Sequence, residues 1–110
     1  MLGRHDHLSM NRLQQHQEEI KVLCKEHAVR SLYVFGSILN HNFSADSDID
    51  LLVEFEWSED RNFWDCYWEL KTALEQLLGR KVDLVCDSAI RNPIFRREVD
   101  THKEAVYDAA

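Results

Sequence analysis

The chain has 110 residues, of which 45% are hydrophobic and 30% are charged, and 13 Lys and Arg stand against 20 Asp and Glu for a net charge of −7. This length and composition predict one globular domain over residues 1–110 and exclude a large multidomain enzyme. The negative charge would repel a phosphate backbone at long range, so nucleic acid is disfavoured as a partner. We expect residues 1–8 to form a flexible terminus.

The cysteines and the apolar segments indicate the compartment. Cys24, Cys66 and Cys86 are an odd number and form no C-x-x-C pattern, so neither a disulfide framework nor a zinc ribbon is predicted. The first residues lack the apolar core of a signal peptide, and no segment approaches the roughly 20 apolar residues of a membrane span. We therefore expect a soluble cytoplasmic protein with no membrane partner, whose cysteines are small buried hydrophobic residues.

The first half of the chain predicts one helix and two strands. Ser9 can cap a helix, which is followed by a short apolar strand at residues 32–35 that ends at Gly36. A polar, turn-rich loop separates it from a second strand at residues 49–55. The first helix is predicted from apolar positions at helical spacing, which are Met10, Leu13, Ile20, Leu23, Cys24 and His27.

The second half predicts two helices around a third strand. Residues 62–78 have apolar positions at helical spacing and are followed by Gly79, which is typical of a helix end. Residues 82–85 form a short strand, and Asn92-Pro93 begins a last helix that ends near residue 107. The stripe of that helix is predicted to contain Phe95, Val99, His102 and Val106. The order α-β-(loop)-β-α-β-α predicts an α/β (α+β) domain in which helices flank a small mixed sheet.

Three acidic residues lie on or beside the predicted strands. Asp48 and Asp50 are separated by one residue, so strand alternation projects both carboxylates from one face. Asp83 interrupts an apolar strand and joins them if the two strands are neighbours. Converging carboxylates repel one another, and a hard divalent cation such as magnesium is the natural compensation. The alternative for such a doublet on its own is a pair of solvated acids that merely flank a strand.

A calcium loop is the rival metal motif, and the sequence excludes it. Asp46, Asp48 and Asp50 would take positions 1, 3 and 5 of an EF-hand. Position 6 would then be Leu51 instead of Gly, and position 12 would be Trp57 instead of Glu. The strand-like residues 49–55 also stand where a helix is needed.

The segment before the acidic doublet makes the site more specific. Gly36 permits a close or left-handed backbone approach, and the hydroxyl of Ser37 and the N–H groups that follow can hold phosphate oxygens. Ten residues separate Ser37 from Asp48, which gives the pattern G-S-x10-D-x-D in the segment GSILNHNFSADSDID. This segment resembles the signature of the polymerase β nucleotidyltransferase superfamily, and most of the chain is similar to its minimal nucleotidyltransferase branch, with Asp83 in KVDLV matching the third carboxylate.

The resemblance implies a fold, a reaction and partners. It implies a polymerase β-like fold in which Asp48, Asp50 and Asp83 are catalytic and bind two magnesium ions, while Gly36 and Ser37 hold the phosphates of a nucleoside triphosphate, with ATP as the co-substrate. Members of the branch pair with a helical HEPN toxin, act as its antitoxin, and transfer AMP from ATP to a toxin tyrosine, releasing pyrophosphate. The predicted elements fill the chain, so the acceptor must be held by another molecule or by a second copy of this chain in a homo-oligomer.

Two other functions stay open. Many members carry arginines after the G-S pair, whereas residues 38–42 here are ILNHN, which slightly favours an antitoxin that acts by binding alone. The presence of all five motif residues favours an active transferase over this alternative; they are Gly36, Ser37, Asp48, Asp50 and Asp83. Nucleotidyl transfer to a small molecule is the other alternative. The basic cluster Arg91, Arg96 and Arg97 could supply positive charge, but a solvated helix face is the favoured interpretation and we leave it out of the site.

Aromatic residues are also concentrated just before and within the helix predicted over residues 62–78. Core packing is the default interpretation, and a surface that binds a partner is the alternative, because clustered exposed aromatic residues favour interfaces. The cluster comprises Trp57, Phe63, Trp64, Tyr67 and Trp68.

Overall fold

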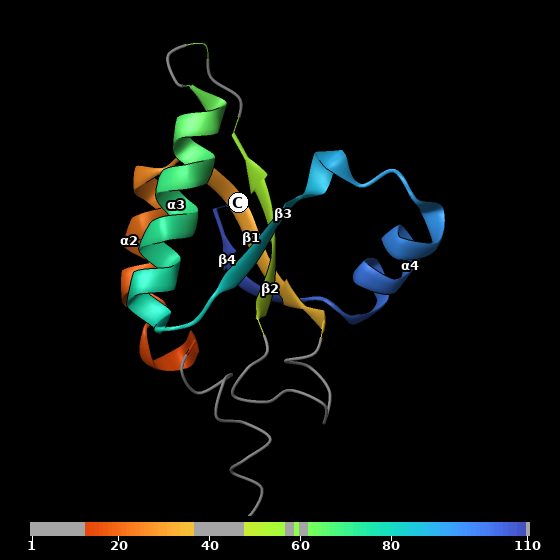
Figure 1. Cartoon of the computed structure of the whole chain (residues 1–110), viewed down its shortest axis with the longest axis horizontal. Coiled ribbons are helices and arrows are strands. Elements are labelled where there is room, and N and C mark those ends of the chain that lie inside the picture. The colour runs from red at the N-terminus through yellow and green to blue at the C-terminus, as the bar shows by residue number, and fades with distance from the viewer. Residues whose placement is uncertain (1–12, 37–47, 57–58, 60–61, 110) are drawn as a thin grey trace, which may run out of the picture.

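The structure is a computed structural model that describes residues 13–36, 48–56, 59 and 62–109 (Figure 1). Its helices are α2 (Gln17–Glu26), α3 (Phe63–Leu78) and α4 (Pro93–His102), with a short 3-10 helix, η2 (Asp87–Ala89). Its strands are β1 (Val29–Phe35), β2 (Ile49–Phe55), β3 (Val82–Cys86) and β4 (Glu104–Asp108).

The four strands form one mixed sheet in the order β3-β2-β1-β4. The strand β1 pairs antiparallel with β2 and with β4, whereas β2 and β3 run parallel. The parallel pair requires a crossover, and α3 supplies it. The predicted α/β class and mixed sheet are therefore confirmed.

Helices cover both faces of the sheet (Figure 1). On one face, α2 and α3 pack over the main apolar core, to which β2 contributes Ile49, Leu51 and Val53, all fully buried. On the opposite face, α4 packs through Val99 against a smaller cluster with Phe35 and Leu52. The strand β2 thus lies between two apolar layers, and its side chains alternate between them.

The ends of α3 and α4 follow local capping rules. Asn62 precedes α3, and its side chain accepts a hydrogen bond from the backbone N–H of Asp65 at 3.1 Å. The helix ends at Gly79, which has φ +68°. Asn92 caps α4 in the same way, accepting from the N–H of Ile94 at 2.8 Å, and Pro93 occupies the first turn. The predicted starts at Asn62 and Asn92-Pro93 are confirmed.

The first predicted helix is interrupted. Residues 13–15 are helical, His16 forms a turn, and α2 follows from Gln17. His27 was expected on the apolar stripe, but it lies just after α2, where its Nδ1 donates to the carbonyl of Leu23 at 2.8 Å. Ser9 and Met10 lie outside the described residues. Among the helices that the structure describes, none has the length and apolarity needed to cross a bilayer.

The end of the chain differs from the prediction. The last helix stops at His102, and residues 104–108 form β4 instead of continuing the helix to residue 107. Val106 therefore belongs to a strand, and its expected place on a helical stripe is wrong. The cause is tertiary: β4 pairs with β1, where Tyr107 opposes Leu32 and is 9% exposed. Without β4, the buried strand β1 would have an unpaired edge.

Side chains of α3 stabilise the other edge of the sheet. The hydroxyl of Tyr67 donates to the carbonyl of Leu84 at 2.7 Å, and the carboxylate of Glu75 accepts from the N–H of Val82 at 3.0 Å. These two bonds satisfy backbone groups of the edge strand β3 on both sides of Asp83. The position of that residue is thus fixed by the sheet and by α3.

Candidate active site

The alternation of β2 places the acidic doublet on the face covered by α4. Ile49 and Leu51 are fully buried in the main core, so Asp48, Asp50 and Leu52 belong to the opposite face. Asp48 is exposed and Asp50 is half-buried. The burial of Ile49 and Leu51 supports the prediction that the two carboxylates share one face.

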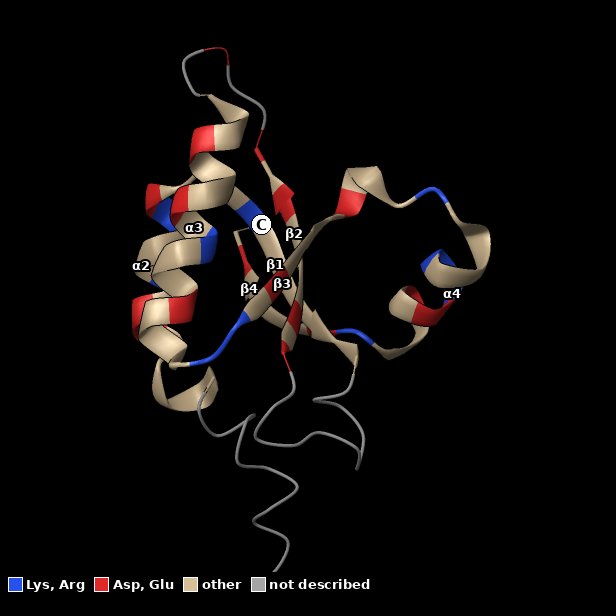
Figure 2. Ribbon diagram, in the orientation of Figure 1, with Lys and Arg blue, Asp and Glu red and all other residues tan. Residues whose placement is uncertain are grey.

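The third acid lies beside the second. Because β2 and β3 are hydrogen-bonded neighbours, Asp50 and Asp83 are register partners, in adjacent strands and on the same face. The register begins at the start of the two strands, where the N–H of Ile49 donates to the carbonyl of Lys81 at 2.9 Å. The condition that the sequence left open, that the strands carrying Asp50 and Asp83 be neighbours, is met (Figure 2).

Gly36 lies directly against Asp50. Phe35, the last residue of β1, is the register partner of Asp50, and Gly36 follows it with φ +83°. A Cβ atom at position 36 would overlap the Asp50 carboxylate. The glycine is therefore required twice, by its left-handed backbone and by the space that the carboxylate occupies. Ser37, the other predicted phosphate-binding residue, lies outside the described residues.

The donor set suits a hard divalent cation. Asp48, Asp50 and Asp83 offer only carboxylate oxygens, the ligands that magnesium prefers. The absence of a side chain at Gly36 leaves the space in which the Asp50 carboxylate lies. Among the residues that the structure describes, however, no three His, Cys, Asp or Glu side chains are already gathered as a metal-binding cluster. The metal site thus stays a prediction that rests on the register of two strands and the chemistry of the donors.

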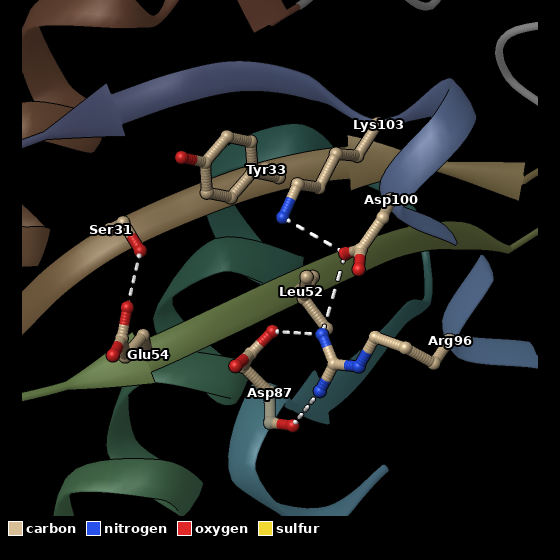
Figure 3. A pocket seen from close by; sticks show the side chains of 8 residues that line it. All are labelled: Ser31, Tyr33, Leu52, Glu54, Asp87, Arg96, Asp100 and Lys103. Carbon is tan, nitrogen blue, oxygen red and sulfur yellow. Dashed lines mark hydrogen bonds and ion pairs between the residues drawn. The ribbon is translucent and has the colours of Figure 1, made fainter. Parts of the chain in front are cut away.

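A polar cavity of about 230 Å³ lies on the same face of the sheet (Figure 3). Leu52, which follows Asp50 on this face, forms part of its lining, so the cavity and the acidic residues share one side of β2. The cavity is lined by Ser31, Tyr33, Leu52, Glu54, Asp87, Arg96, Asp100 and Lys103.

Ion pairs across the cavity hold α4 to the sheet. Arg96 donates to the Asp87 carboxylate at 2.8 Å and to the Asp87 carbonyl at 2.7 Å, and it also contacts Asp100 at 3.4 Å. Lys103 donates to Asp100 at 3.2 Å, and its ammonium lies 4.5 Å from the centre of the Tyr33 ring. The hydrogen bond from Lys103, reinforced by Arg96, holds the pKa of Asp100 below its usual value. These cations have partners and serve to position α4.

The three arginines of the predicted basic cluster have different environments in the structure. Arg96 is half-buried in ion pairs, so the solvated interpretation is wrong for this residue, whereas Arg91 and Arg97 are exposed. Sequence reasoning missed the ion pairs of Asp87 and Lys103. The one signal for them was charge spacing: Arg96, Asp100 and Lys103 are four and three residues apart, so they share one side of a helical turn.

The cysteines lie outside this site. Cys24 and Cys66 are buried and Cys86 is half-buried, in agreement with the prediction of small buried hydrophobic residues for the first two. Burial raises the pKa of the Cys24 thiol to about 12. That thiol stays protonated at neutral pH and is chemically inert.

Comparison with known proteins supports the same interpretation of the motif. The model of the family "Polymerase beta, Nucleotidyltransferase" matches residues 18–110. The chain is 39% identical over 80 residues to the Methanocaldococcus jannaschii protein named "Putative protein adenylyltransferase MJ0128", an alignment that covers 73% of this chain and 79% of that protein. It is 36% identical over 92 residues to protein adenylyltransferase MntA of Thermococcus cleftensis, which covers 84% of each chain.

A solved structure agrees with these relatives. The structure described as a "putative minimal nucleotidyltransferase" superposes with a TM-score of 0.72 at 36% identity and covers 89% of this chain and 96% of its own. The resemblance seen in GSILNHNFSADSDID is therefore confirmed at the level of the whole fold. This chain belongs to the polymerase β nucleotidyltransferase family of enzymes, within its minimal nucleotidyltransferase branch.

Proposed function

We propose that this chain is a cytoplasmic, magnesium-dependent protein adenylyltransferase that transfers AMP from ATP to a tyrosine of a HEPN-type toxin and thereby acts as its antitoxin. The relatives named adenylyltransferases support the reaction. Two more distant structures with the same fold support the partner and the nucleotide. One is a tri-AMPylated Shewanella oneidensis HEPN toxin in complex with its MNT antitoxin, at 23% identity and a TM-score of 0.60. The other is a toxin–antitoxin complex with AMP-PNP, at 24% identity and a TM-score of 0.64.

The observation that carries the proposal is the register pairing of Asp50 with Asp83 beside Gly36. Asp48 and Asp50 would hold the metal ions, which would supply positive charge for the triphosphate, and Asp83 would complete the site on the side of the attacking hydroxyl. Gly36 and Ser37 would hold phosphate oxygens at the end of β1. Bound magnesium would neutralise the phosphate oxygens and make the α-phosphorus electrophilic.

The reaction is a displacement at the α-phosphorus of ATP. The tyrosine oxygen forms a bond to this phosphorus, and the bond to the oxygen that bridges to the β-phosphorus breaks. Pyrophosphate leaves with the electron pair, and the phenolic proton passes to solvent or to a carboxylate. The protein contributes position and fixed charge, which account for most of the catalysis in phosphoryl transfer.

The test is a mass measurement on the intact proteins. The chain, the HEPN-type protein proposed as its partner, ATP and magnesium are incubated together, and both proteins are weighed. We expect the partner to gain one or more AMP masses. Asp48→Asn and Asp50→Asn should each lower the rate at least about a hundredfold, since a lost metal ligand removes several kcal/mol of transition-state stabilisation.

The matched control is Asp108→Asn, the same substitution at an exposed residue of β4. It should transfer AMP at the wild-type rate. Thermal melts should show that both catalytic variants are folded at the assay temperature, so that a lost rate reports on the site and not on the fold. Near-normal turnover in Asp50→Asn would overturn the assigned roles. A stable complex with no mass gain from ATP, GTP, CTP or UTP would identify an antitoxin that acts by binding alone. AMP found only on a small molecule would identify nucleotidyl transfer to a small-molecule acceptor.

A further inference from the structure

Three large aromatic side chains at the start of α3 are exposed. The exposed fractions are 42% for Phe63, 62% for Trp64 and 56% for Trp68, and Tyr67 lies half-buried between them. Core packing, the default expected from the sequence, is therefore wrong for these three residues, and Trp57 lies outside the described residues. We call Phe63, Trp64, Tyr67 and Trp68 the aromatic surface.

The fold does not need this surface for its core. The side of α3 that is buried in the core carries Cys66, Leu70, Leu74 and Leu78, spaced four residues apart. The exposed rings lie on the adjoining side of the helix, next to the edge strand β3 that Tyr67 contacts. A large apolar area left outside a filled core is typical of a surface that binds another molecule.

The rings of the aromatic surface support one another. Phe63 contacts Phe55 and Trp64, each with ring centres 5.3 Å apart, and Tyr67 contacts Trp68 with ring centres 5.1 Å apart. These pairs are edge-to-face, the favoured geometry for aromatic rings. The ring contacts hold these side chains in place before anything binds. Docking of a partner therefore costs the ring side chains little conformational entropy.

Exposed carboxylates lie in and before the same part of α3. Asp65 and Glu69 are exposed on the same two turns of the helix, and the exposed residues Glu56 and Glu59 precede it in the chain. Residues 63–70 read FWDCYWEL and contain no basic residue. Of the nearest basic residues, Lys71 donates to Glu75 at 3.0 Å, His27 lies 3.7 Å from Glu69, and Arg61 lies outside the described residues. The surface therefore combines aromatic faces with negative charge.

We propose that the aromatic surface docks a protein partner through arginine side chains that the partner presents. A guanidinium stacks on the face of an indole ring and at the same time donates hydrogen bonds to neighbouring carboxylates. Trp64 and Trp68 supply the faces, and Asp65 supplies an acceptor within one helical turn. Glu69 supplies a second acceptor, which a partner would share with His27, whose Nε2 lies 3.7 Å from the Glu69 carboxylate. Tryptophan and arginine are also the residues that most often dominate the energy of protein interfaces.

Charge and hydrogen bonding argue against two other occupants. A second copy of the chain would bring the same acidic surface and a net charge of −7 against its own. An added β-strand would need free backbone groups along β3, but Tyr67 and Glu75 already bond to the backbone of Leu84 and Val82. A basic protein surface is the occupant that fits.

The catalytic carboxylates lie on the face of the sheet opposite to α3, and only Tyr67 of the aromatic surface reaches β3 beside Asp83. Phe63 packs on Phe55 at the carboxyl end of β2, whereas Asp50 lies five residues earlier on that strand, or about 17 Å at the rise of a β-strand. A partner can thus stay docked on α3 without covering the site. The inference rests on the proposed function in one respect, because the partner used to test it is the proposed acceptor.

The test separates binding from transfer. The dissociation constant of the proposed HEPN-type partner is measured by calorimetry, and its AMP gain is measured by mass. The double variant Trp64→Ala, Trp68→Ala should bind at least about tenfold more weakly. Transfer should slow at low partner concentration and recover when the partner is saturating, because the catalytic residues are intact. The variant Asp65→Asn, Glu69→Gln should bind more weakly and lose part of the salt dependence of binding.

Three controls make the result specific. Val22→Ala shortens another exposed apolar side chain, on α2, and should bind as the wild type does. Trp64→Phe, Trp68→Phe keeps two aromatic faces and should recover part of the affinity. In the absence of the partner, the wild-type chain and the Trp64→Ala, Trp68→Ala variant should have the same sedimentation coefficient.

Each outcome separates this inference from the proposed function. Wild-type affinity in the double-alanine variant overturns the docking inference, even where AMP transfer is normal. A wild-type dimer that this variant dissociates also overturns it, in favour of a second copy as the occupant. Weakened binding in that variant, with no AMP transfer by the wild type, supports the docking surface and overturns the proposed transferase.

Discussion

At the residue scale, Gly36 shows how one position serves both the backbone and the site. It has φ +83°, and a side chain there would overlap the Asp50 carboxylate. Gly36→Ala should lower the free energy of unfolding by about 1–3 kcal/mol and should also displace Asp50, so transfer should fall with stability. A urea melt and the rate of AMP transfer, measured below the melting range, check both parts.

The matched control is Gly79→Ala. Gly79 also has a positive φ, +68°, at the end of α3. An alanine there imposes a similar backbone strain without placing a methyl group against Asp50. This variant should lose stability and keep the wild-type rate of transfer. Equal rates in the two variants would show that the space beside Asp50 does not matter for catalysis.

At the element scale, the edge strand β3 depends on one carboxylate of α3. Glu75 accepts hydrogen bonds from the N–H of Val82 and from Lys71, each at 3.0 Å, and these bonds hold its pKa below the usual value. A lowered pKa in the folded state stabilises the fold above the unfolded pKa of about 4.3, and this contribution is lost as the pH falls through the folded pKa.

Glu75→Gln should therefore destabilise the protein at about pH 7, and the difference from wild type should shrink below about pH 4. The effect at neutral pH should be under about 1 kcal/mol, since the side chain is 29% exposed and solvent screens its charge. Urea unfolding at the two pH values measures it. Glu18→Gln, at a side chain that is 86% exposed, should have no such pH dependence. A difference that grows in acid would contradict the assigned role.

The elements that could be predicted are those whose signal is local. The limits of α3 follow from Asn62 and Gly79, and β2 follows from apolar residues between acids. The strand β4 could not be found in this way, because EAVYD is short and Val106 fits the helical spacing of Val99 and His102 equally well. Its pairing with β1 decides the outcome, and pairing with a strand about 70 residues earlier leaves no local trace.

The candidate site also has features that the local sequence predicts and features that only the tertiary fold determines. The G-S-x10-D-x-D spacing identified Gly36, Asp48 and Asp50, and the alternation within a strand assigned the two acids to one face. That Asp83 is the register partner of Asp50 needed the strand order, which single-strand patterns do not contain. The exposure of Trp64 and Trp68 needed the orientation of α3 on the sheet. Helical spacing assigns residues to a side of the helix, but it does not say where the core ends.

At the scale of the whole molecule, net charge decides how a nucleotide can bind. The chain carries −7, and the face that bears Asp48, Asp50 and Asp83 adds local negative charge to this. ATP is itself an anion, so its binding without a cation is opposed both at long range and within the site. We therefore expect nucleotide binding to require magnesium, beyond any need for the metal in the chemical step.

Thermal melts in four conditions test this expectation. Magnesium and ATP together, at about 100 times the dissociation constant, should stabilise the fold by about 2.7 kcal/mol and raise the melting temperature by on the order of 10 °C. ATP with a chelator should leave it unchanged, and magnesium alone should have a smaller effect. Asp50→Asn should lose the shift given by magnesium and ATP, measured against the melting temperature of its own ligand-free form.

A contrary outcome would change which residues bind the nucleotide. An equal shift by ATP in the chelator would mean that cationic side chains hold the triphosphate without a metal. Arg91 and Arg97, both exposed, would then be the residues to substitute, since Arg96 is held by Asp87 and Asp100. Loss of ATP binding in Arg91→Gln, Arg97→Gln with no effect in Asp50→Asn would move the phosphate site from the acidic residues of β2 to α4 and the loop before it.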